Sequence, residues 1–177
     1  MPISQSGIAI IRALWYDCEM KTHEYYFQKA AEQARLATCY RAKCGSVIVS
    51  KRGLIIGKGF NAPPLYDDKL RTCFVDWNLS IKPKFDKTCC IHAEWNAMID
   101  AMKNHGNEID GGALYFARVD ENGELKVSSG KPHCTTCSRL ALQTGLKTFG
   151  LWTGEPKIWN VRDYNNESYN YYAQKQK

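Results

Sequence analysis

Apolar and polar positions follow two different periods along this chain, and together they predict an alternation of helices and strands. Between residues 23 and 40, alanines and Phe27 recur at helical spacing with charged residues between them, which predicts an amphipathic helix. Two β-branched runs, 45–50 and 54–59, flank Lys51-Arg52-Gly53 and predict a β-hairpin. Further helices are predicted at about 92–104 and 134–144, and further strands at about 114–117, 147–152 and 158–161.

This order predicts an α/β fold, in which helices pack against a mixed sheet. The 177 residues, without a repeat or a linker, suit a single domain over 1–177, with roughly the first 20 and the last 15 residues peripheral. Residues 62–90 form a long irregular stretch, of a kind that is often functional. The tail 164–177, rich in Tyr and Asn, is either a docked helix or partly disordered.

Composition gives limited information about the partner of the protein, its compartment and the state of its cysteines. The formal charge of +6 favours an anionic partner such as a nucleotide or a nucleic acid. No apolar run is long enough to span a bilayer, and the short run 7–11 does not have the pattern of a signal peptide, so we expect a cytoplasmic protein without a membrane partner. In a reducing compartment the eight cysteines are metal ligands or thiols rather than a disulfide framework. Cys73, Cys89 and Cys90 leave open a second metal site.

The candidate metal-binding and catalytic residues lie in His92-Ala93-Glu94 and in the downstream pair Cys134-x-x-Cys137. One imidazole and two thiolates can hold zinc and leave its fourth tetrahedral position for water, as in catalytic sites. Both segments fall at predicted helix starts, where the partial positive charge favours thiolates. Glu94 is placed to move protons for that water. A redox C-x-x-C is the alternative, but such a motif would follow an early strand, whereas this one lies late in the chain.

The spacing H-x-E … P-C-x-x-C is typical of zinc deaminases, and three segments resemble the cytidine and deoxycytidylate deaminase superfamily, most closely the dCMP deaminases. They are the run from Ala37 through Val49, the glycine-rich run Ile56–Pro63 and the run Cys90–Ala97. The resemblance covers roughly residues 25–152. It implies a three-layer fold with a five-stranded mixed sheet flanked by helices, one catalytic Zn²⁺ and a homo-oligomer.

The resemblance also implies roles for individual residues. Glu94 is expected to be the acid and base that serves attack of water at C4 of cytosine and departure of ammonia. His133 separates Pro132 from Cys134, where the family usually has Pro directly before the first cysteine, and we expect it near the pocket mouth. Expected substrate contacts are Asn61, Ala93, Arg41, Lys43, His133 and Trp95, with Tyr115 and Trp152 as further candidates for base stacking.

The leading functional prediction is conversion of dCMP to dUMP, with a small-molecule nucleotide as the partner. A deaminase acting on cytidine or adenosine in RNA or single-stranded DNA is the alternative favoured by the positive charge and the aromatic residues. Deaminases of guanine or of a pterin share the metal motif and stay open. A non-catalytic zinc-binding protein would keep the His and Cys ligands, but it would have no need of Glu94.

Overall fold

The computed structural model describes residues 21–73 and 90–173 of the chain, with side chains described up to residue 170. The run 7–11, residue Cys89 and the last four residues lie outside these ranges, as does most of the predicted long loop. The helices are α2 (His23–Arg35), α3 (Ala93–His105), α4 (Thr135–Gln143) and α5 (Val161–Ala173). The strands are β1 (Lys43–Val49), β2 (Ile55–Phe60), β3 (Ala113–Val119), β4 (Thr148–Trp152) and β5 (Pro156–Asn160).

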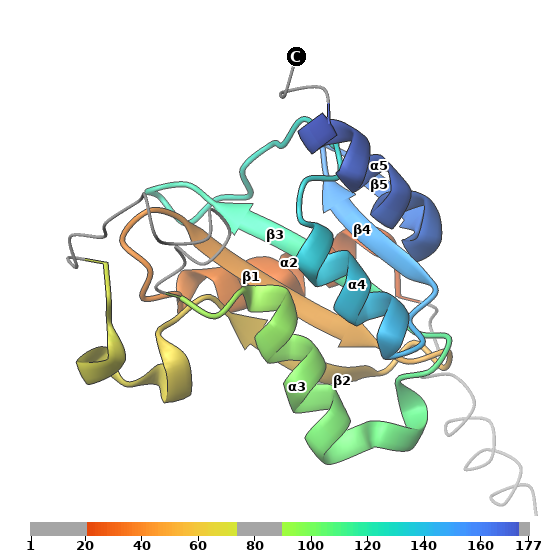
Figure 1. Ribbon diagram of the computed structural model, residues 1–177, viewed down its shortest axis with the longest axis horizontal. Coiled ribbons are helices and arrows are strands. Elements are labelled where there is room, and N and C mark those ends of the chain that lie inside the picture. The colour runs from red at the N-terminus through yellow and green to blue at the C-terminus, as the bar shows by residue number, and fades with distance from the viewer. Residues whose placement is uncertain (1–20, 74–89, 174–177) are drawn as a thin grey trace, which may run out of the picture.

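The five strands form one mixed sheet in the order β2-β1-β3-β4-β5. Strand β1 pairs antiparallel with both β2 and β3, β3 pairs parallel with β4, and β4 pairs antiparallel with β5. Helix α2 covers one face of the sheet, and α3, α4 and α5 cover the other (Figure 1). The structure therefore confirms the predicted three-layer α/β fold.

Each face of the sheet has its own apolar core. On the α2 side, Phe27 and Val47 are fully buried and pack with Tyr115. On the other side, Met98 of α3 and Phe149 of β4 are fully buried and pack with Tyr164 of α5. The sheet is thus covered on both faces, which explains why its central strands are near-continuous apolar runs in the sequence.

Two glycines of β2 let α3 approach the sheet closely. A Cβ atom on Gly57 would lie 2.3 Å from the backbone oxygen of Ala97, and one on Gly59 would lie 2.3 Å from the backbone nitrogen of Ala97 and 2.6 Å from the oxygen of Ala93. Any side chain at these positions would push the helix away, because close-packed interiors leave no room for it. The spacing Gly-Lys-Gly thereby sets the position of α3, the helix that begins beside His92.

Several predicted boundaries differ from the structure. The strand predicted at 158–161 is β5, Pro156–Asn160, and Val161 begins α5 instead. Helix α2 ends at Arg35 rather than near residue 40, because the backbone N–H of Ala37 turns back to the carbonyl of Ala34 and closes a tight final turn. The last 15 residues are not wholly peripheral, since Tyr164 and Ser168 of α5 are buried. None of the described helices has the length and apolar character that crossing a membrane requires.

Candidate metal centre

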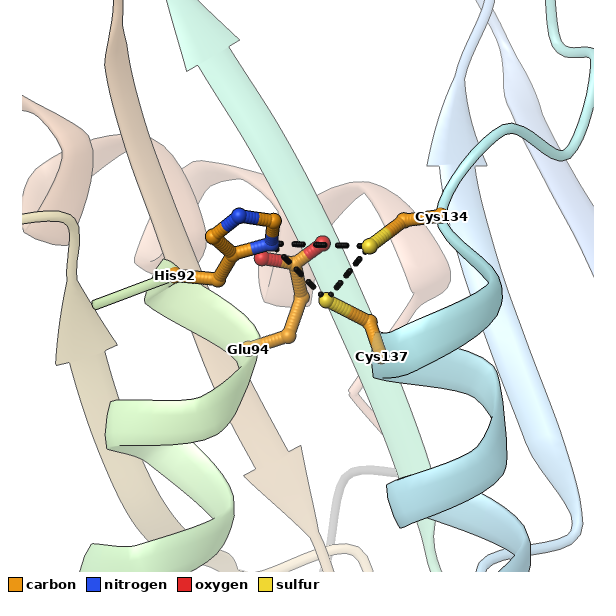
Figure 2. A group of neighbouring side chains, drawn as sticks. All are labelled: His92, Glu94, Cys134 and Cys137. Atoms are coloured by element: carbon orange, nitrogen blue, oxygen red, sulfur yellow. Dashed lines mark hydrogen bonds between the residues drawn. The ribbon is translucent and has the colours of Figure 1, made fainter. Parts of the chain in front are cut away.

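Four side chains from two distant segments meet on the α3–α4 side of the sheet. His92 and Glu94 come from the start of α3, and Cys134 and Cys137 from the start of α4 (Figure 2). One ligand atom from each of the four lies within 4.8 Å of the others. The structure thus brings together the two halves of the predicted metal site, which are about 40 residues apart in sequence.

The three predicted ligand atoms form a compact triangle. His92 Nδ1 lies 3.1 Å from the sulfur of Cys137 and 3.5 Å from that of Cys134, and the two sulfurs are 2.9 Å apart. A point equidistant from these three atoms, in their plane, is about 1.8 Å from each, less than the roughly 2.0–2.3 Å of zinc bonds to nitrogen and sulfur. The three atoms thus converge closely on one point, and an imidazole with two thiolates is a donor set that suits zinc.

Local helix geometry explains how each half is held. His92 is the residue that caps the start of α3, and its carbonyl accepts the first helical hydrogen bond, from Asn96 at 3.1 Å. Cys134 has the same place at the start of α4, where its carbonyl accepts from Ser138 at 3.1 Å. Cys137 follows three residues later, so both sulfurs lie on one face of the first turn.

The electrostatics of the cluster favour a thiolate at Cys134. Hydrogen bonds from the Cys137 thiol and from the His92 ring lower the pKa of Cys134 to about 3. In turn, the hydrogen bond to Cys134 raises the pKa of His92 to about 9. The position of Cys134 at a helix start favours the negative charge in the same direction. A negative sulfur beside an imidazole and a second thiol is a donor set suited to a cation.

Burial dominates the other two members of the cluster. Glu94 is 5% exposed, and this burial raises the pKa of its carboxyl, as does the nearby negative charge of Cys134. Cys137 is fully buried, which raises the pKa of its thiol well above the usual value. A carboxyl with a raised pKa, held beside a metal donor set, exchanges protons more readily near neutral pH than an exposed glutamate does.

Three of the predicted substrate contacts lie at the cluster. His133 is exposed beside Cys134, and its charge lowers the pKa of Glu94, which places it near the carboxylate. Ala93 is fully buried and stands between His92 and Glu94 in the sequence. Trp95 is half-buried, with its ring centre 6.4 Å from that of His92, and it packs against the core beneath the site.

The Asn61 side chain is occupied by the backbone of its own chain. Its Oδ1 accepts from the N–H of Cys44 at 2.9 Å, and its Nδ2 donates to the carbonyl of Ala42 at 2.8 Å. The amide therefore ties the end of β2 to the entry of β1 and keeps one N–H for any further contact. Arg41 and Lys43 are exposed at this same entry.

The sheet separates two predicted stacking residues from the cluster. Tyr115 and Trp152 pack with Phe27 of α2, at ring distances of 5.3 and 5.4 Å, on the opposite face from the cluster. The expectation that these two stack on a base is therefore wrong. β3 is a continuous apolar run, and such a run does not reveal which of its alternate residues faces which layer.

Sequence reasoning missed three residues that pack behind the cluster. Ser138 follows the ligand Cys137, and Tyr164 and Asn165 belong to α5. Val161, Tyr164 and Ser168 are buried at spacings of three and four residues. That helical spacing was present in the tail, but it lies among Asn, Glu and Tyr residues whose composition conceals an apolar stripe.

Comparisons with known proteins point to one family. A family model described as the cytidine and deoxycytidylate deaminase zinc-binding region matches residues 20–152. The comparison with curated proteins gave no match.

Solved structures with similar folds include two of the dCMP deaminase of cyanophage S-TIM5. The apo form is 25% identical over 71% of this chain and 78% of that chain, with a TM-score of 0.46. The complex with dCMP and dUMP is 24% identical over 71% and 76%, with a TM-score of 0.48. A cytidine deaminase from Burkholderia pseudomallei is 15% identical over 81% and 96%, with a TM-score of 0.53, and this likeness supports the fold.

Proposed function

Because the chain belongs to the cytidine and deoxycytidylate deaminase family, we propose that it is a zinc-dependent hydrolase that removes the amino group of a cytosine nucleotide, converting dCMP to dUMP with release of ammonia. The observation that carries the proposal is the meeting of an imidazole, two cysteine sulfurs and a buried carboxyl at the starts of α3 and α4. The segments that resemble dCMP deaminases and the net charge of +6 support an anionic nucleotide as substrate.

His92, Cys134 and Cys137 would hold one zinc ion. The burial and the raised pKa of Glu94 suit it to carrying protons rather than to serving as a fourth ligand. Bound by three protein ligands, zinc supplies a coordinated water whose pKa falls to about 7.

Glu94 then carries the proton transfers of the reaction. Its carboxylate accepts a proton from the attacking water, and the carboxyl delivers a proton to the ring nitrogen N3 while the water oxygen bonds to C4. The hydroxyl now on C4 gives its proton to the Glu94 carboxylate, which passes it to the exocyclic amine. The C4–N bond then breaks and ammonia leaves, so that the base keeps a carbonyl oxygen. Positioned proton transfer of this kind contributes about 10²–10⁴ in rate.

The substrate contacts follow the placement of the predicted residues. We assign His133 to the mouth of the pocket, Ala93 and Trp95 to its wall beside the metal ligands, and the remaining N–H of Asn61 to the sugar. Exposed Arg41 and Lys43 are assigned to the phosphate, because their charges are available at the entry to β1. A homo-oligomer in the cytoplasm completes the proposal.

The substitution Glu94→Gln tests the chemistry, because it keeps the size of the side chain and removes its ability to carry protons. We expect the purified variant to hold as much zinc per chain as the unaltered protein, measured by elemental analysis. Release of ammonia from dCMP should fall by about 10²-fold or more. Turnover at the unaltered rate would contradict the role of Glu94.

A panel of amino-bearing substrates tests the specificity. We expect ammonia from dCMP to exceed that from cytidine, guanine, a pterin and a cytosine-containing single-stranded oligonucleotide. Preference for the oligonucleotide would instead assign the chain to nucleic-acid deamination, and zinc binding without ammonia from any substrate would assign it to the non-catalytic class.

A further inference from the structure

Helix α5 lies beyond the region that matches the family, yet it packs directly on the helix that carries both cysteines. The family match ends at residue 152, whereas α5 spans Val161–Ala173. The helix runs alongside α4 and close to β4 and β5 (Figure 1). Its face toward the molecule buries Val161, Tyr164 and Ser168 at 1%, 1% and 0% exposure. This face is built from residues that have no role in the proposed reaction.

Tyr164 reaches from α5 toward the loop that carries the first cysteine. Its ring stacks on Phe149, with centroids 4.0 Å apart and planes 17° apart. It belongs to the same buried cluster as Cys137, against which Cys134 also packs. Burial raises the pKa of Tyr164, whereas the backbone of His133, the residue before Cys134, favours the ionised form of its hydroxyl and lowers that pKa by less, which places His133 near the phenol. The phenol therefore lies near the backbone immediately before a metal ligand.

Asn165, the next residue of α5, contacts the first turn of α4 through Ser138. The Ser138 hydroxyl lies 3.0 Å from Asn165 Oδ1 and 3.0 Å from the carbonyl oxygen of Thr135, and Ser138 is fully buried directly after Cys137. Its single proton is shared between these two acceptors. Adjacent residues of α5 thus lie near the chain immediately before Cys134 and contact it immediately after Cys137.

We propose that α5 is a working part of the metal centre, in which Tyr164 and Asn165 are positioning residues that hold the two cysteine sulfurs in ligand geometry. Groups that orient metal ligands without contacting the metal typically change affinity about 10-fold to 100-fold when they are removed. Support on both sides of the Cys-x-x-Cys turn fixes the sulfur positions before the ion arrives, which lowers the cost of ordering them on binding. The inference rests on the metal ligands of the proposed function and not on its substrate.

The test measures zinc binding rather than activity. Tyr164→Phe removes one hydroxyl and keeps the ring that stacks on Phe149. Tyr169→Phe removes the same hydroxyl from an exposed position of the same helix, which makes it the matched control. Zinc affinity is measured by competition with a chromophoric chelator, and ligand geometry by the thiolate-to-metal absorption of the cobalt-substituted protein. We expect Tyr164→Phe to bind zinc about 10-fold or more weakly with an altered cobalt spectrum, and Tyr169→Phe to match the unaltered protein.

A second pair of variants separates positioning from general loss of stability. Asn165→Ala removes the acceptor for Ser138, whereas Asn165→Asp keeps an oxygen in the same place, so we expect the first to weaken zinc binding and the second to restore it. This pair decides the question if Tyr164→Phe fails to fold.

The outcomes distinguish this inference from the proposed function. Unchanged zinc affinity and an unchanged cobalt spectrum in both Asn165→Ala and a folded Tyr164→Phe would overturn the role of α5. An unaltered protein that binds zinc but releases no ammonia would overturn only the proposed reaction. An unaltered protein that binds no zinc would overturn both.

Discussion

The contact between β2 and α3 yields a prediction whose size can be worked from the structure. A Cβ atom added at Gly59 would lie 2.3 Å from the backbone nitrogen of Ala97 and 2.6 Å from the oxygen of Ala93, whereas ordinary contact begins at 3.4 Å. Both neighbours are backbone atoms of α3, which cannot rotate out of the way. Gly59→Ala must therefore displace the helix by about 1 Å, because the packed interior leaves no free volume to absorb the methyl group.

We expect this displacement to affect stability and the metal centre together. Overpacking of this kind typically costs about 1–3 kcal/mol in the free energy of unfolding. Because α3 carries Glu94 and begins beside His92, a shift of that size should also cost about 10²-fold in turnover. Urea unfolding, zinc competition and release of ammonia from dCMP measure the three effects on one preparation.

Gly106→Ala is the matched control, because it adds the same methyl group at the end of the same helix. Nothing lies within 4 Å of the added Cβ, and the backbone there is already helical, with φ of −50°. We expect this variant to be unchanged or more stable by about 0.5–1 kcal/mol. Wild-type stability and zinc affinity in Gly59→Ala would refute the argument that the two glycines set the position of α3.

Two further predictions concern stability away from the metal. Asn61→Ala should cost about 1–3 kcal/mol in urea unfolding, because it leaves the N–H of Cys44 without its partner, whereas Asn104→Ala at an exposed site should stay within about 0.5 kcal/mol. Burial raises the pKa of Tyr115 to about 12, so its ionisation favours the unfolded chain once the pH exceeds about 10. Stability should therefore fall by about 2 kcal/mol in total between pH 10 and pH 12 from this residue alone, an average of about 1 kcal/mol per pH unit, and Tyr115→Phe should flatten the fall by that amount. An unchanged slope would contradict the assignment.

The helices and strands could be predicted largely from residue periodicity, because both periods are strong in the segments that form the sheet and its cover. The convergence of His92, Glu94, Cys134 and Cys137 could also be predicted, since residue type, spacing and helix starts all pointed to one site. The internal bonding of Asn61 could not be predicted, because the partners of a side chain depend on how β1 and β2 enter the sheet. The order of the strands and the docking of α5 depend on long-range packing in the same way.

The placement of the ligands at two helix starts has a consequence for the folded chain as a whole. His92 is 42 residues before Cys134 and 45 before Cys137, and the whole of β3 lies between them. A metal ion held by all three would close a loop of the chain that contains the central strand β3, in the manner of a covalent cross-link. For a loop of this length, the lost freedom of the unfolded chain corresponds to about 4 kcal/mol. The same ion that serves the reaction would then also stabilise the packing of α3 and α4 over the sheet.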